Sequence, residues 1–199
     1  MSLTSKSSMR TAVSVVTAGL LLAPVTGCAT DDAPPPPVRT GTATPGPSES
    51  PGAPAPTRLT VPSLGIDSTL LRLGLNEDGT VEVPPAEKGM TAGWYAGGAV
   101  PGEPGAAVLI GHNDTRFGKA VFHDLHTIAK GADIAVSGGG GEKVHFTVSG
   151  TETVSKKTFP TQKVYGATDE SVLRLITCDG AFDAAGHPVD NLIVYATLR

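Results

Sequence analysis

The sequence predicts an all-β domain, a barrel of about eight short strands with only short helical turns. Glycine and proline are abundant, with 25 and 17 among 199 residues, and both interrupt helices and separate short strands. Between these breaks, stretches recur in which apolar and polar residues alternate or apolar residues are continuous. No long stretch has the periodicity of an amphipathic helix. These three observations together favour the barrel.

In the first half of the domain the pattern predicts four strands, at 58–66, 68–75, 80–83 and 106–110. The first of them contains a proline, which is typical of an edge strand or a bulge. The segment NEDG at 76–79 has the composition of a turn. We expect a helical turn at 91–95, which directs Trp94 and Tyr95 into the core, and a turn or short helix at 119–125.

In the second half the pattern predicts four more strands, at 133–137, 143–154, 171–177 and 191–198. The stretch 143–154 alternates regularly, with Val144, Phe146 and Val148 on one face and polar residues on the other. The glycines at 138–141 predict a flexible turn, and 159–165 is expected to form an irregular turn.

The first 28 residues have the features of an export signal. Lys6 and Arg10 precede an apolar run at 12–23, which is shorter than the roughly 20 residues of a membrane span. The run ends in VTGC at 25–28, which resembles the bacterial lipobox. This resemblance implies that Cys28 carries lipid and anchors the protein to the outer face of the cell membrane. The alternatives are an ordinary cleaved signal peptide with an incidental cysteine and an uncleaved signal anchor.

Residues 29–57 predict a disordered linker. This segment is rich in Pro, Ala, Thr, Gly and Ser and includes four consecutive prolines at 34–37. It contains too few apolar residues to form a core, so we expect an extended tether. Such a tether acts either as a spacer that reaches into the cell wall or as an inert leader. The folded domain is then expected to span 58–199.

Charge and metal-ligand spacing exclude several classes of function. The formal net charge is −4, and no basic cluster indicates a nucleic-acid partner. His123 and His126 lack a third ligand and the spacing of zinc peptidases, so we expect no metal and no cofactor. Two cysteines in an exported chain favour a disulfide by default. The surroundings of Cys28 and Cys178 differ so much, however, that we expect each to have its own role.

Two side chains with useful chemistry follow apolar strands. Cys178 lies in LRLITCDG at 173–180, and His112 lies in VLIGHND at 108–114. If the two strands are neighbours, both side chains reach one rim of the barrel. A thiolate is a strong nucleophile, and a nearby imidazole can exchange its proton or stabilise it. Taken alone, each residue more often has a structural role, the cysteine as a small buried hydrophobe and the histidine as a turn residue.

The domain resembles the sortase family, and most closely the class F sortases of high-GC Gram-positive bacteria. The resemblance rests on RLTVPSLGID at 58–67, GHNDTRFGKAVFHDL at 111–125, LRLITCDGAFD at 173–183 and DNLIVYATL at 190–198. It implies an eight-stranded sortase barrel in which Cys178 attacks a sorting signal resembling Leu-Pro-x-Thr-Gly. It also implies that the acyl-thioester is resolved by an amine of a cell-wall precursor, with His112 as general acid and then base.

One position departs from the family pattern. Sortases carry an arginine on the last strand, whereas that position here is Asn191 and no arginine lies between Cys178 and Arg199. Arg174 is a candidate replacement, because strand alternation places it on the face of Cys178 at roughly 13 Å. The alternative is that Arg174 is a solvated strand residue or only contacts the substrate.

Arg116 and Asn191 are further candidates for contacting substrate. A chain in which none of these residues serves would be a weak or inactive sortase-like lipoprotein that binds wall peptides. A cysteine peptidase that hydrolyses its acyl-enzyme is the remaining alternative.

Overall fold

The computed structural model describes residues 54–199. The signal segment predicted for 1–28, with Cys28, and most of the linker predicted for 29–57 lie outside these residues and stay predictions. The first strand begins at Pro56 rather than at 58. Within residues 54–199, no helix has the length and hydrophobicity needed to cross a membrane.

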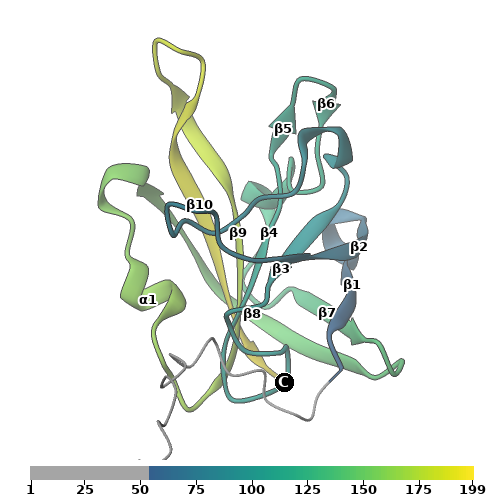
Figure 1. The fold of residues 1–199 in the computed structure, drawn as a ribbon. Helices are drawn as coiled ribbons and strands as arrows, with labels where there is room; N and C mark the ends of the chain where they lie inside the picture. Colours follow the sequence, from purple (N-terminus) through teal and green to yellow (C-terminus); the bar gives the residue numbers. More distant parts are fainter. Residues whose placement is uncertain (1–53) are drawn as a thin grey trace, which may run out of the picture. The chain divides into compact units, whose positions relative to one another are not determined.

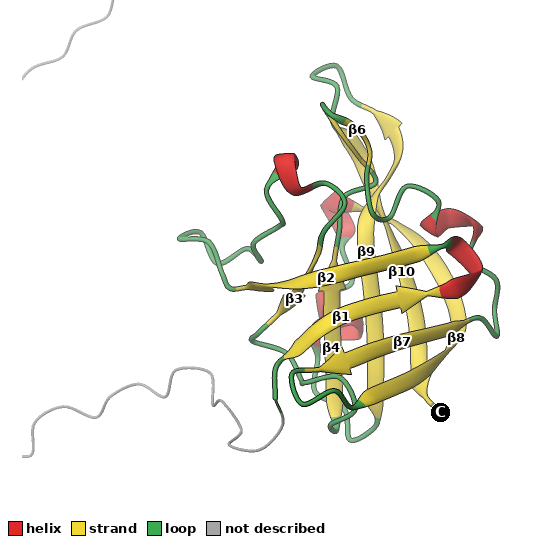
Figure 2. Ribbon diagram, turned by 90° about the vertical axis from the view of Figure 1, so that its right-hand side faces the viewer, coloured by secondary structure: helices red, strands yellow, loops and turns green. Residues whose placement is uncertain are grey.

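Eight strands close into a barrel in the order β1-β2-β3-β4-β9-β10-β8-β7 (Figures 1 and 2). Their bounds are β1 (Pro56–Val61), β2 (Ile66–Leu73), β3 (Ala92–Tyr95), β4 (Gly105–Ile110), β7 (Asp133–Gly138), β8 (Lys143–Ser155), β9 (Ser171–Phe182) and β10 (Pro188–Leu198). The β2–β3 and β4–β9 pairs are parallel, and the other pairs are antiparallel. The prediction of an all-β, eight-stranded barrel is confirmed.

Short elements connect the strands. A two-stranded hairpin consists of β5 (Asp114–Thr115) and β6 (Gly118–Lys119). The helical elements are η1 (Pro62–Leu64), η2 (Ala86–Lys88), η3 (Leu125–Thr127), η4 (Lys156–Thr158) and α1 (Thr161–Tyr165). Figures 1 and 2 show that the β5–β6 hairpin and the far end of the β9–β10 hairpin project at the same end of the barrel.

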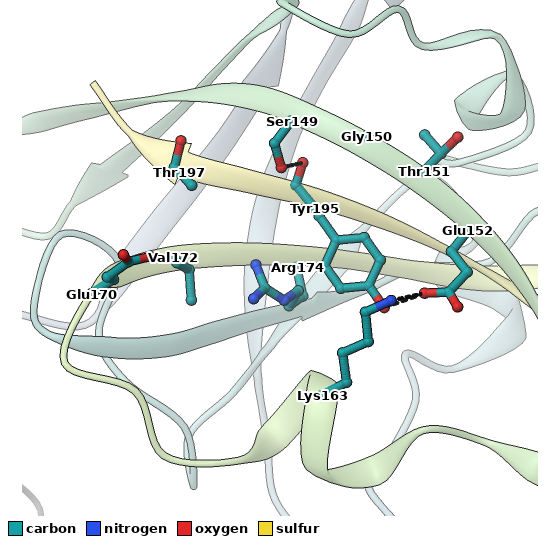
Figure 3. Close-up of a pocket in the computed structure, with 10 residues that line it drawn as sticks. All are labelled: Ser149, Gly150, Thr151, Glu152, Lys163, Glu170, Val172, Arg174, Tyr195 and Thr197. Carbon is teal, nitrogen blue, oxygen red and sulfur yellow. Dashed lines mark hydrogen bonds and ion pairs between the residues drawn. The ribbon is translucent and has the colours of Figure 1, made fainter.

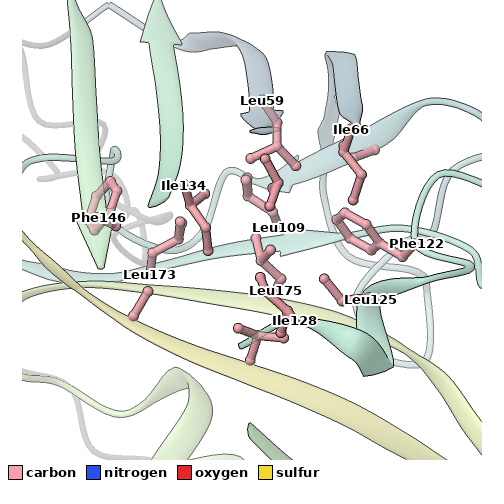
Figure 4. Close-up of a cluster of buried hydrophobic side chains, with 14 of the residues drawn as sticks. Leu59, Ile66, Leu109, Phe122, Leu125, Ile128, Ile134, Phe146, Leu173 and Leu175 are labelled. Atoms are coloured by element: carbon pink, nitrogen blue, oxygen red, sulfur yellow. The ribbon is translucent and has the colours of Figure 1, made fainter. Parts of the chain in front are cut away.

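The interior of the barrel is filled by alternate residues of its strands. Leu109 of β4, Phe146 of β8 and Leu175 of β9 have no exposed surface, and they pack with Phe122 and Leu125 from the connection that follows β6 (Figure 4). Complete burial of such side chains stabilises the fold by about 1.5–3 kcal/mol each. The burial also determines which residues of each strand face outward.

A second apolar layer covers the outer face of three of these strands. Val108 of β4, Ile176 of β9 and Ile193 of β10 point outward and pack against Val164 of α1. Tyr165, at the end of α1, packs edge to face against Tyr95 of β3 with ring centroids 5.9 Å apart. The central strands are therefore buried on both faces, which explains their continuous apolar sequences.

The helical turn predicted at 91–95 is wrong, because these residues form β3. Gly93 and Trp94 pair with β4 on one side and with β2 on the other. A β-carbon at Gly93 would lie 2.5 Å from the side chain of Leu73, so this pairing requires glycine. Pairing between segments far apart in the chain leaves no local periodicity to detect.

Other predicted boundaries also differ from the structure. The strand predicted at 80–83 is reduced to a single bridge between Val81 and Leu75. The irregular turn predicted at 159–165 contains α1. The strands predicted at 171–177 and 191–198 extend to Phe182 and back to Pro188. Backbone pairing continues there after burial has ended, and the hydrophobic pattern does not report such an extension.

We predict that Tyr165 makes the fold sensitive to alkali. Burial raises the pKa of Tyr165 from 10.0 to about 12, so between these pH values the unfolded chain releases a proton that the folded chain retains. The stability of the fold therefore falls as the pH rises through this interval. In urea unfolding followed by Trp94 fluorescence, Tyr165→Phe should lose less stability between pH 10 and 12 than the wild type. Parallel losses in the two proteins would contradict this assignment.

Candidate active site

Cys178 lies on the outer face of β9, at the level where the buried part of the strand ends. Leu175 and Thr177 are buried, whereas Cys178 is a partly exposed free thiol. The strand does not end at this residue, as the sequence predicted, but continues to Phe182 with exposed side chains. Cys178 therefore stands at the base of the projecting β9–β10 hairpin, on the same face as Ile176.

His112 lies just past the end of β4, the strand next to β9. Ile110 of β4 pairs with Ile176 of β9, so His112 and Cys178 each lie two residues beyond a paired isoleucine. Two hydrogen bonds continue the contact past the end of β4. The amide of Gly111 donates to the carbonyl of Ile176 (3.1 Å), and Asn113 Nδ2 donates to the carbonyl of Cys178 (3.3 Å). These two bonds keep the backbone on either side of His112 next to β9, so the structure brings the chain at His112 close to the chain at Cys178.

The imidazole of His112 is held in one orientation. Its Nε2 lies 2.6 Å from the carbonyl oxygen of Pro84. A carbonyl oxygen can only accept, so Nε2 carries the hydrogen and Nδ1 is the basic nitrogen of the neutral ring. The carbonyl of His112 in turn accepts from the amide of Phe122 (2.9 Å). These contacts leave one nitrogen of the ring able to take up a proton.

Gly111 allows the chain to turn closely over the core at this point. A β-carbon there would lie 2.6 Å from the ring of Phe122 and 2.7 Å from Val121. The amide of Ala120 donates to the carbonyl of Asn113 (3.0 Å) and closes the loop that contains the β5–β6 hairpin. The position of His112 therefore depends on contact between a glycine and a buried aromatic ring.

Asn191 and Lys156 lie on the other side of the thiol. Asn191 of β10 pairs directly with Cys178, and Val154 of β8 pairs with Asn191. Lys156, two residues past Val154, places its Nζ 3.5 Å from Cys178 Sγ. Sequence analysis did not identify Lys156, because only the pairing of three strands connects it with the cysteine.

Arg174 is directed away from Cys178. Its guanidinium stacks on the ring of Tyr195 at 4.7 Å, and its Nη1 donates to the carbonyl of Leu173 (3.1 Å). Arg174 and Tyr195 line a pocket on the outer face together with Lys163 and Glu152, whose side chains form an ion pair (Figure 3). Burial lowers the pKa of Arg174.

The lining of this pocket, as described for residues 54–199, includes neither Cys178 nor His112. Arg174 shares a face of β9 with the cysteine, as strand alternation predicts. Its direct partner across the β9–β10 pair, however, is Tyr195, and the guanidinium stacks on the ring of this tyrosine.

Arg116 lies in the turn of the β5–β6 hairpin. Its guanidinium is 4.8 Å from the ring centroid of Phe117, which is itself exposed. The hairpin is tied to the following turn by His123, whose Nδ1 lies 2.9 Å from Asp114 Oδ1. In the described part of the chain, no group of three or more His, Cys, Asp or Glu side chains is arranged to hold a metal ion.

Comparisons with known proteins agree with this architecture. A family model described as "Sortase domain" matches residues 59–199. Sortase C-1 from Actinomyces oris is similar with a TM-score of 0.57 and 21% identity, over 72% of this chain and 73% of that chain. Sortase A from Corynebacterium diphtheriae is similar with a TM-score of 0.57 and 19% identity, over 74% of this chain and 62% of that chain. No curated protein matches the chain.

We predict that Gly111→Ala destabilises the fold by about 1–3 kcal/mol, because the added methyl group overpacks the core against Phe122. The free energy of unfolding in urea measures this effect. The matched control is Gly150→Ala in β8, where a β-carbon meets no atom within 4 Å, and which should change stability by less than about 0.5 kcal/mol. Equal effects at the two glycines would show that close packing at Gly111 does not hold the His112 turn.

Proposed function

Because the chain belongs to the sortase family, we propose that it is a class F cysteine transpeptidase acting on protein substrates with a Leu-Pro-x-Thr-Gly-like sorting signal. Cys178 is the nucleophile and His112 the proton-transfer group. The observation that supports these roles is the β4–β9 pairing, in which the segment with His112 follows β4 next to the part of β9 that carries Cys178. The class assignment rests on the motifs at 111–125 and 173–183.

In the first step, Cys178 Sγ attacks the carbonyl carbon of the scissile peptide bond as a thiolate. The sulfur–carbon bond forms, and negative charge moves to the carbonyl oxygen. The carbon–nitrogen bond then breaks, and the departing amine takes a proton from the His112 imidazolium. The products are an acyl-thioester on Cys178 and a free amine.

In the second step, an amine of a cell-wall precursor attacks the thioester. His112, now neutral, accepts the proton that the amine loses. The new carbon–nitrogen bond forms, the sulfur–carbon bond breaks, and the Cys178 thiolate is restored. If water replaces the amine, the same steps amount to peptide hydrolysis. The supply of an amine therefore separates a transpeptidase from a peptidase.

We predict that Cys178→Ala abolishes cleavage of quenched fluorescent peptides of the Leu-Pro-x-Thr-Gly type, with a loss of at least about 1,000-fold. Peptide turnover is measured by fluorescence, and the thioester adduct by mass spectrometry of the intact protein. Only the wild type should form the adduct. Adding a cell-wall amine should divert the acyl-thioester from hydrolysis, so that a ligated peptide forms in place of the hydrolysis product.

Equal turnover by the wild type and by Cys178→Ala would refute the assignment of the nucleophile. A wild type that binds the peptides but neither cleaves them nor forms an adduct would instead support an inactive sortase-like lipoprotein. Asn191→Ala is a useful companion variant, because Asn191 pairs with Cys178 and is proposed to contact the substrate.

We further infer that the protein is held at the outer face of the cell membrane by lipid on Cys28. The VTGC motif at 25–28 supports this inference, and the proline-rich composition of residues 29–57 supports a spacer between the membrane and the barrel. This location would bring the catalytic domain to exported substrates and to wall precursors.

We predict that Cys28→Ala moves the protein from the membrane fraction to the medium, because two or three acyl chains supply the stable part of the attachment. Fractionation and immunoblotting measure the distribution. Cys178→Ala serves as the control and should stay with the membrane. Unchanged retention of Cys28→Ala would favour an uncleaved signal anchor.

A further inference from the structure

A lysine that the sequence motifs did not single out contacts the thiol. Lys156 Nζ lies 3.5 Å from Cys178 Sγ. The two arginines considered from the sequence have other contacts, since Arg174 stacks on Tyr195 and Arg116 lies over Phe117. Of these three side chains, Lys156 is therefore the one whose positive charge lies at the sulfur.

The position of Lys156 follows from how β8 ends. Ser155 is the last residue of this strand, and its side chain accepts a hydrogen bond from the amide of Lys157 (3.3 Å), which turns the chain into η4. Val154, Asn191 and Cys178 form one row across β8, β10 and β9. The long side chain of Lys156 spans the remaining distance from the end of β8 to the sulfur.

We propose that Lys156 is a catalytic residue that stabilises the Cys178 thiolate and takes the place of the arginine that sortases carry on the last strand. As the thiolate attacks, its charge moves to the carbonyl oxygen of the substrate. A cation beside the sulfur remains near this charge throughout the step. This proposal deepens the proposed transpeptidase function and rests on it. Formation of the thiolate, however, can be measured without measuring peptide transfer.

Other titratable side chains lie on the elements around the thiol. Four of them are His112 after β4, Asp179 on β9, Asp190 on β10 and Lys157 on η4. Asp179 is adjacent to Cys178 in β9 and therefore points to the opposite face of the strand, where its carboxylate accepts from Thr153 Oγ1 (3.0 Å). Asp190 is its partner on β10. The ammonium of Lys156, by contrast, lies 3.5 Å from the sulfur itself.

The test is alkylation of Cys178 by iodoacetamide as a function of pH, in the full-length protein. Mass spectrometry of the peptide that contains Cys178 follows this cysteine separately from Cys28. Only the thiolate reacts. Lys156→Met should therefore move the rate profile to higher pH and lower the rate at pH 7 by about fivefold, as expected for removing a unit charge near the surface. Lys156→Arg should keep most of the wild-type rate.

Lys157→Met is the matched control, since it removes an equal charge from the next residue, and it should leave the profile unchanged. A second measurement needs no variant. Raising NaCl from about 0.05 M to 1 M should move the wild-type profile towards that of Lys156→Met, because salt screens exposed charge pairs. Superimposable profiles for the wild type and Lys156→Met, or equal shifts for the two lysine variants, would overturn the proposal.

Peptide transfer gives the second readout. Lys156→Met should lower kcat/KM for transfer by about tenfold or more, with the affinity for the peptide little changed. If the wild type transfers no peptide but Lys156→Met is still alkylated more slowly than the wild type, the proposed function is refuted and the role of Lys156 at the thiol is kept. Full transfer and unchanged alkylation by this variant would refute the role of Lys156 and keep the function.

Discussion

The candidate active site depends on the parallel pairing of β4 with β9, two strands that are far apart in the sequence. This pairing places Ile110 opposite Ile176, so that the next outward position on each strand belongs to His112 and Cys178. The leucine before each isoleucine is fully buried in the barrel. Because side chains alternate along a strand, a slip of one residue would turn the cysteine into the core. Packing of the interior thus determines the geometry of the site.

The thiol lies where the outer apolar layer ends. Ile176 is packed in that layer, whereas Cys178, the next outward residue of β9, is partly exposed. At this edge of the outer apolar layer the sulfur is accessible to a peptide, although it belongs to a strand of the barrel. His112 follows β4, and Lys156 follows β8. Three strands thus position the three groups, and the register of the sheet sets where they lie.

Much of the barrel was predictable because its strands have a clear hydrophobic pattern. The strand predicted at 143–154 nearly coincides with β8, and the strand predicted at 106–110 with β4. β3 was missed because it has only four residues and Ala92, Gly93 and Trp94 are all buried, so no alternation marks it as a strand. The far part of the β9–β10 hairpin was missed because its side chains are exposed and carry no pattern of burial.

The sequence alone determined that this chain forms a β-barrel, and it predicted Cys178 as the candidate nucleophile with His112 as its partner. Both conclusions come from local signals, namely alternation along strands and the motifs around the two residues. The tertiary structure decided which cation stands at the sulfur. Arg174 is on the same strand as the cysteine but stacks on Tyr195, whereas Lys156 reaches Sγ from β8 across β10. Sheet order and register create that proximity, and they arise from long-range pairing that no local pattern encodes.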